Sequence, residues 1–204
     1  MSDNNIQTLP LLPLKNTVLF PYLLMPLSVG RASSLAAIEA ALATEEKEIV
    51  VFAQRDASVE VPKQDDLFGV GTKAIIRKMS RSENGALELL VLGMERVALI
   101  KVDDSEPFMR ARVHPLPLPE DTSAEMEALQ GALVDLATRA IAMAQPNSPQ
   151  EVGRLLANGN EDPLRLAFLL ASMFGVDLEK QQSLLEADSR VEAILLRSSR
   201  TCTS

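Results

Sequence analysis

Few residues in this chain have side chains that could do chemistry. The 204 residues include one histidine, His114, and one cysteine. A Ser–His–Asp triad would have to use His114, which directly precedes a proline, and a zinc site needs a set of His and Cys ligands that this sequence lacks. The acidic pairs Asp65-Asp66 and Asp103-Asp104 lie in turn-like contexts, where solvated carboxylates are the favoured interpretation. We therefore predict no catalytic residue, no metal and no cofactor.

The segment GVGTKA (69–74) matches the Gly-x-Gly-x-x-Ala form of a dinucleotide-binding motif. That motif needs a strand before it and a helix after it, so that the helix N-terminus faces the pyrophosphate. The segment that follows, AIIRKM, instead has a β-type pattern. No Gly-x-x-x-x-Gly-Lys-Ser/Thr phosphate-binding loop occurs in the sequence. A glycine-bearing turn that leads into a strand is the favoured interpretation.

Basic residues follow this segment at a spacing that suits a strand. Lys73, Arg77 and Arg81 would share one face, with Lys78 on the opposite face. A stand-alone nucleic-acid-binding module could use them as a phosphate-binding strip, and its binding would then weaken steeply with salt. The net charge of −8 argues against wholesale nucleic-acid binding. Charges that protect a sheet edge from aggregation are the favoured interpretation of the strip.

The opening segment LPLLPLKNTVLFPYLLMPL (9–27) has the length and hydrophobicity of a membrane span, but it contains four prolines. Each proline inside a helix removes a backbone hydrogen bond and clashes with the preceding turn, so a spanning helix is not expected. The first residues lack the positive charge of a signal peptide, and the single cysteine fits a reducing compartment. We therefore predict a cytoplasmic protein that does not enter the membrane.

The elements that must position these residues begin with β structure. Prolines occupy sheet edges and strand starts, so residues 8–15 and 18–29 are predicted to be short strands and extended connections. A helix is predicted at 33–46 behind a serine cap, and the Asn-Gly in 82–85 predicts a hairpin turn. Short runs rich in branched residues predict the remaining strands at 48–54, 72–79, 86–93, 96–102 and 108–113. Together these elements predict a small β-barrel with one helix.

The pattern changes after an extended, proline-rich connector at 114–123. Helical periodicity then predicts a C-terminal helical bundle with helices at 124–144, 148–158, 161–174, 178–186 and 189–197. The seam of the first of these helices is formed by Met126, Leu129, Leu133, Leu136, Ala140 and Met143. The predicted organisation is α+β, with a barrel at 1–117, a bundle at 118–197 and a disordered tail at 198–204.

Apolar side chains crowd the bend near Phe20, and Met79 lies in a strand that also carries charges. From the sequence alone, two interpretations stand. These residues could be core that packs inside the barrel or against the helices, or they could form an exposed patch for binding a partner, since methionine adapts its shape to varied surfaces.

Five segments in order carry a resemblance to a known family. They are LPLLPLKNTVLFPYLLMPLSVGR (9–31), DDLFGVGTKAII (65–76), NGALELLVLGMERV (84–97), EDPLRLAFLLAS (161–172) and QSLLEADSRVEA (182–193). They resemble the N-terminal domain of Lon, the ATP-dependent protease, over residues 8–194. The family usually has an acidic residue where Leu92 stands and often an Asp where Phe168 stands, so the sequence departs from it at these positions.

The resemblance implies a PUA-like β-barrel followed by a helical bundle. It also implies a non-catalytic role in selecting unfolded or tagged protein clients and in organising a homo-oligomer, with ATP hydrolysis and peptide cleavage carried by other modules. We predict that clients contact Pro21, Tyr22, Leu24, Met25 and Met79, because these apolar residues lie in segments that bend or carry charge.

Overall fold

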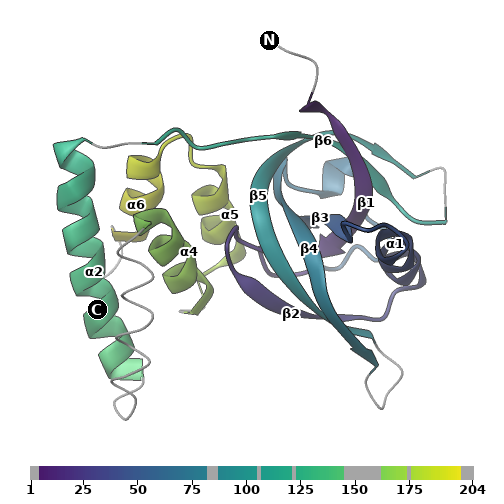
Figure 1. Cartoon of the computed structure of the whole chain (residues 1–204), viewed down its shortest axis with the longest axis horizontal. Coiled ribbons are helices and arrows are strands. Elements are labelled where there is room, and N and C mark those ends of the chain that lie inside the picture. Colours follow the sequence, from purple (N-terminus) through teal and green to yellow (C-terminus); the bar gives the residue numbers. More distant parts are fainter. Residues whose placement is uncertain are drawn as a thin grey trace. The chain divides into compact units, whose positions relative to one another are not determined.

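Strands with one α-helix among them make up the described first half of the chain, and helices alone follow in the second half (Figure 1). The computed structural model describes residues 5–81, 87–104, 107–120, 123–144, 162–173 and 176–198. The chain divides into two units, residues 1–117 and 118–204, which we call the first and the second unit. The predicted turn at 82–85 and the predicted helix at 148–158 lie outside the described residues, as does the predicted tail beyond Ser198.

The first unit is built on a mixed sheet. Its strands pair in the order β2-β5-β4-β3-β1-β6, and β5 also pairs with β6. The pairings of β5, β4, β3, β1 and β6 therefore close into a cycle, with β2 added at the side of β5. Only β1 and β3 run parallel among the described strands. The strands are β1 (Gln7–Leu14), β2 (Leu24–Val29), β3 (Glu48–Ala53), β4 (Val70–Arg81), β5 (Leu87–Asp103) and β6 (Arg110–Pro115).

The prolines of the opening segment lie where the sheet tolerates a missing backbone donor. Strand β1 pairs with β6 through residues 7–10 and with β3 through residues 11–14, so it changes partner between Pro10 and Pro13. Pro26 lies in β2, at the end of the strand order. The expectation that prolines mark strands and edges is therefore confirmed for Pro10, Pro13 and Pro26, whereas Pro21 lies in a turn outside the strands.

The predicted strands at 86–93 and 96–102 form one strand, β5, which corrects the prediction of two. Ala74 pairs with Gly93 and Lys73 pairs with Glu95, so Met94 is an extra residue in a β-bulge. A bulge bends a strand without ending its pairing. The sequence around Met94 therefore produces a bend and not a turn.

Helix α1 (Ala32–Leu42) packs against β1 and β3 and buries Ala37, Ile38 and Ala41. The prediction of a serine cap is wrong, because the helix begins one residue before Ser33. Arg31 is the N-cap residue and makes no capping hydrogen bond with its side chain. A 3-10 turn, η2 (Gln64–Asp66), precedes β4.

Two apolar clusters hold the first unit together. Alternate residues of β3 enter different clusters, because Ile49 and Val51 pack with α1 whereas Val50 and Phe52 pack with β6 residues such as Val113. Both faces of β3 are thus buried, which explains its uninterrupted apolar sequence.

The second unit contains α2 (Ala124–Ala144), α4 (Pro163–Met173), α5 (Leu178–Glu186) and α6 (Arg190–Ser198). Helices α2, α4 and α6 share an apolar cluster that includes Met126, Leu133 and Leu170. The predicted seam of α2 is confirmed for its first half, where Met126 and Leu133 are buried. Arg190 of α6 is paired with Asp162, which precedes α4, at 3.0 Å between Nη1 and Oδ1.

Candidate functional site

A sharp corner at residues 20–24, here called the Tyr22 corner, joins the end of the connection after β1 to β2. Tyr22 has φ of 67°, in the left-handed region that bulky residues rarely adopt. The corner is held by two backbone hydrogen bonds to β5, from Tyr22 N to Gly93 O at 2.9 Å and from Gly93 N to Leu23 O at 3.0 Å. A strained conformation persists only where its surroundings impose it, so this corner is a firmly shaped feature of the surface.

Gly93 makes this close approach of two backbones feasible. A Cβ at position 93 would lie 2.2 Å from Phe20 O, which no real side chain tolerates. Phe20 itself is fully buried, and the hydroxyl of Thr72 donates a hydrogen bond to Leu19 O at 2.6 Å. The corner is thus anchored from below while the side chain of Tyr22 stays 44% exposed.

Beside the corner, apolar residues line the outward face of three strands. Leu24, Leu92 and Ile75 pair in one row across β2, β5 and β4, and Pro26 and Leu90 pair in the next row. Paired residues project from the same face of a sheet. These five residues, here called the outer apolar surface, are exposed or half-buried, whereas the alternate residues of β5 are buried on the other face. Leu24 is 57% exposed.

The structure places the five predicted contact residues in different environments. Tyr22 and Leu24 are exposed at and beside the corner. Pro21 is buried, and Met25 is half-buried and packs on the core beneath β2, so neither lies on the outer apolar surface. Met79 is 46% exposed, but it pairs with the buried Leu89 and therefore belongs to the opposite face of the sheet.

Sequence reasoning missed Ile75, Leu90 and Leu92. The segment LELLVL (87–92) is apolar at nearly every position, so its alternation does not reveal which residues point outward. A signal was present in Glu88, because residues two and four positions after a solvated residue of a strand share its face.

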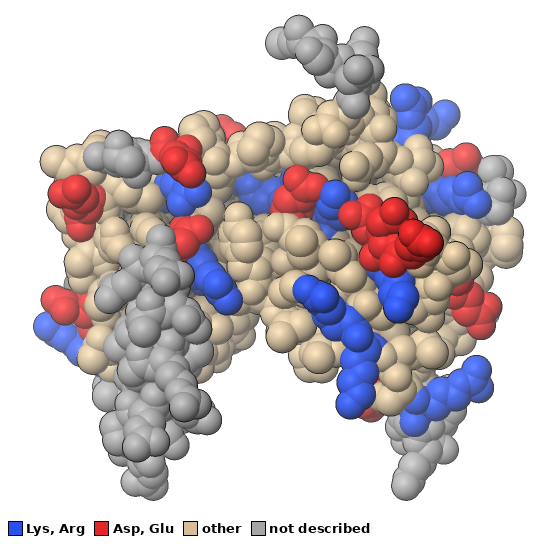
Figure 2. All heavy atoms as spheres, in the orientation of Figure 1, with Lys and Arg blue, Asp and Glu red and all other residues tan. Residues whose placement is uncertain are grey.

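Lys73, the first residue of the predicted basic strip, is already paired with carboxylates and is not available to bind phosphate. Lys73 Nζ lies 2.6 Å from Glu95 Oε1 and 3.4 Å from Glu48 Oε1. Burial acts to lower the pKa of Lys73, but the hydrogen bonds and charges of Glu95 and Glu48 outweigh it and raise the pKa. Basic and acidic side chains also lie next to one another on the face shown in Figure 2. Lys73 is thus neutralised within the sheet.

Arg77 and Arg81 lie farther along β4, where its pairing with β3 has ended at Ile75 within the described part of the sheet. Both are exposed. This part of β4 still pairs with β5 but has no described partner strand on its other side, which agrees with the interpretation that the two arginines protect a sheet edge.

The other candidate residues have ordinary structural positions. Gly71, in the GVGTKA segment, lies within strand β4, where a Cβ would lie 2.4 Å from Val51 O. His114 lies in β6, exposed to solvent, and not in the connector as predicted. Among the described residues, no group of three or more His, Cys, Asp or Glu side chains could hold a metal ion.

Comparison with known proteins decides the family. The family model described as the ATP-dependent protease La (LON) substrate-binding domain matches residues 8–195. The chain belongs to the Lon substrate-binding domain family. The Lon protease of Nitrosococcus oceani is 44% identical to it over 187 residues, and that of Koribacter versatilis is 36% identical over 181 residues.

These matches span 92% and 88% of this chain but only 24% and 22% of the two relatives. The chain therefore covers about a quarter of the length of the Lon proteases it matches. Among the described residues, no helix has both the length and the hydrophobicity to cross a membrane.

Solved structures of Lon N-terminal domains share the fold. The N-terminal domain of Mycobacterium avium complex Lon protease matches with a TM-score of 0.76 at 20% identity, covering 95% of this chain and all of that one. The Lon N-terminal domain protein from Xanthomonas campestris matches with a TM-score of 0.65 at 20% identity, over 90% and 92% of the two chains. The mixed sheet and helices are thus those of a Lon N-terminal domain.

Proposed function

We propose that the Tyr22 corner and the outer apolar surface bind exposed apolar segments of unfolded or tagged proteins, which a Lon-type protease then degrades. The observation that carries this proposal is the outward row of Leu24, Leu92 and Ile75, which ends beside the exposed and rigidly held Tyr22. Misfolded proteins differ from native ones by exposing apolar segments, and exposed apolar patches on a folded domain mark interaction sites.

Weak individual contacts suit this role, since a receptor for many clients cannot be complementary to one of them. In a homo-oligomer of Lon subunits, several copies of the surface would act on one client, and the effective concentration multiplies modest affinity. In this proposal the chain itself is non-catalytic. ATP hydrolysis and peptide-bond cleavage belong to the remainder of a full-length Lon protease acting in the cytoplasm.

We also propose a finer description of the architecture that presents this site. We interpret the closed cycle of strand pairings as a small PUA-like β-barrel spanning residues 1–117, and the helices of residues 118–197 as a bundle. Pro21 and Met25 keep a role beneath the site, because they fill the space under the corner and strand that present Tyr22 and Leu24.

The direct test measures the affinity of a labelled, permanently unfolded protein by fluorescence anisotropy. Replacing Tyr22→Ser and Leu24→Ser together should weaken binding by about 1–2 kcal/mol, or about five- to thirtyfold, because it removes two exposed apolar side chains. The matched control is Val61→Ser, since Val61 is 81% exposed but lies outside the surface. Equal affinity of wild type and a folded double variant would refute the proposed site.

Met79→Ser tests how far the site extends. Met79 lies on the other face of the sheet near the end of β4, so we expect a smaller loss of about two- to threefold if long clients wrap around this edge. Unchanged affinity would confine the site to the Tyr22 corner and the outer apolar surface.

A further inference from the structure

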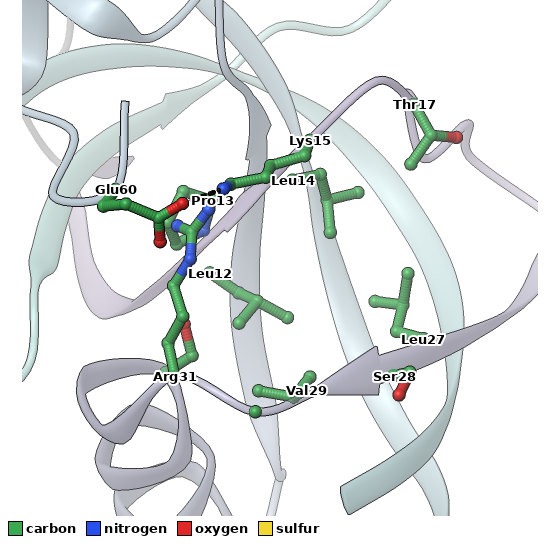
Figure 3. A pocket seen from close by; sticks show the side chains of 12 residues that line it. Leu12, Pro13, Leu14, Lys15, Thr17, Leu27, Ser28, Val29, Arg31 and Glu60 are labelled. Atoms are coloured by element: carbon green, nitrogen blue, oxygen red, sulfur yellow. Dashed lines mark hydrogen bonds and ion pairs between the residues drawn. The ribbon is translucent and has the colours of Figure 1, made fainter. Parts of the chain in front are cut away.

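An open pocket of about 430 Å³ lies between β1, β2 and the start of α1, apart from the outer apolar surface. Its apolar wall is formed by Leu12, Leu14, Leu27 and Val29. Figure 3 shows these side chains turned toward one space, with Lys15, Arg31 and Glu60 converging at one end of it. The pocket therefore has an apolar part and a charged part.

The charged end contains two cationic side chains, Lys15 and Arg31. Arg31 Nη2 donates a hydrogen bond to Gln54 Oε1 at 3.0 Å. Arg31 Nη1 is buried and has no hydrogen-bond partner among the residues that the structure describes. A buried donor of this kind is rarely left unsatisfied in native proteins, so an unpaired guanidinium nitrogen beside a pocket points to a ligand that completes it.

A carboxylate of the protein already lies at this end. Glu60 Oε1 is 2.7 Å from Lys15 Nζ, and the hydrogen bond and charge of Lys15, with a smaller contribution from Arg31, lower the pKa of Glu60. The side chain of Glu60 is largely exposed to solvent. Ion pairs at such sites contribute little net stability, so a competing carboxylate can displace this one at small cost.

The loop that carries Glu60 is tied to Arg31 through one buried residue. Gln54 Nε2 donates to Val59 O at 2.9 Å while Gln54 Oε1 accepts from Arg31. Arg31 is also the N-cap residue of α1, where the helix dipole favours a negative charge. The side chain of Arg31 extends from the start of α1, and its hydrogen bond to Gln54 fixes the guanidinium at the charged end of the pocket.

We propose that this pocket binds a carboxylate of a client polypeptide, with Arg31 and Lys15 pairing the carboxylate, the apolar wall receiving the attached side chain, and Glu60 acting as a displaceable stand-in. The proposal deepens the proposed function and rests on it, because it adds a chemically selective site to a nonselective apolar surface. The carboxylate is either the C-terminus of a client or an Asp or Glu side chain. Arginine suits both, because its planar guanidinium matches carboxylate geometry.

The test compares three short labelled peptides with the same apolar sequence, using fluorescence anisotropy and the whole chain at low salt. One has a free C-terminal carboxylate, one is amidated, and one is amidated but contains an internal Glu. We expect at least one carboxylate peptide to bind about fivefold or more tightly than the amidated peptide, and which one does so identifies the source. Equal binding of all three would overturn the proposal.

Variants assign the effect to the pocket. Arg31→Gln should abolish the preference for the carboxylate peptide, whereas Arg31→Lys should retain part of it. Glu60→Gln should strengthen carboxylate binding by about two- to fivefold, because the internal competitor is removed. The matched control is Arg77→Gln, an exposed arginine of β4 outside the pocket, which should preserve the preference. If Arg31→Gln fails to fold, Glu60→Gln decides, since an unchanged preference there would overturn the proposal.

The two proposals fail in different ways. If the amidated peptide binds and the Tyr22→Ser, Leu24→Ser variant weakens it, while a carboxylate adds nothing, the proposed function stands and the pocket proposal falls. If no peptide binds at all, both proposals fall.

Discussion

The two units treat their large apolar side chains differently. Among the described residues, seven of the eight large apolar side chains that are exposed lie in the first unit, and only Met173 lies in the second. Helices α2, α4 and α6 turn their apolar stripes toward a common cluster, whereas the part of β5 that precedes its bulge is apolar on both faces and fully buries only one. Among the described residues, the helices thus use their apolar side chains for a core, while the sheet leaves some of its apolar side chains exposed, as the proposed function requires.

The largest effect that we predict is a loss of stability in the second unit. Phe168→Ala should cost about 3–5 kcal/mol of unfolding free energy, because the ring lies fully buried in α4 and its loss leaves a cavity. Urea unfolding followed by circular dichroism measures it. Client affinity, determined under conditions where the variant is folded, should stay at the wild-type value. A large loss of affinity in the folded variant would contradict the division of roles.

Gly93→Ala should break the Tyr22 corner and with it the proposed site. Its Cβ would meet Phe20 O at 2.2 Å, so the two backbones must separate, at a cost of about 1–3 kcal/mol. Thermal unfolding and client anisotropy should both report a loss. The matched control is Gly69→Ala, where a Cβ would meet nothing within 4 Å and both quantities should change little. If clients bind the folded Gly93→Ala variant normally, the shape of the corner is irrelevant to binding.

Tyr22→Gly, for which we expect the smallest change in stability, tests whether an exposed residue of the first unit serves binding at the expense of stability. Glycine adopts positive φ without strain, so removing Tyr22 should raise the unfolding free energy by about 0.5–1 kcal/mol. Client affinity should fall in the same variant, because the exposed ring is gone. Opposite signs of the two changes, measured by urea unfolding and anisotropy, would show that strain is retained for binding. A destabilised variant would instead show that the ring supports the fold.

Local patterns in the sequence were sufficient for much of the fold. Branched runs predicted β3 and β4 nearly to their ends, and the connector predicted where helices begin. The division of β5 into two strands was wrong, because a bulge at Met94 and a turn have similar sequence signals. Tertiary contacts alone decide whether a strand bends there or stops.

The candidate sites depended more on distant contacts. The exposure of Tyr22 and Leu24 follows from the anchoring of Phe20 on Gly93, a contact between residues far apart in the sequence. The pocket joins Lys15, Arg31 and Glu60 from three separate segments. No periodicity in one segment could have brought these side chains together.

Gln54 links Arg31 to the loop that carries Glu60, and this link needs a side chain that both donates and accepts hydrogen bonds. The side-chain amide of Gln54 accepts a hydrogen bond from Arg31 at Oε1 and donates one from Nε2 to Val59 O, and the residue is fully buried. Deamidation to glutamate would keep the shape yet set a negative oxygen against that carbonyl oxygen, whereas lysine would set a cation against the guanidinium. No other natural side chain of this length carries both polarities, so hydrolysis of this one amide, which consumes a water molecule and releases ammonia, would remove the hydrogen bond that holds the loop at Val59 O.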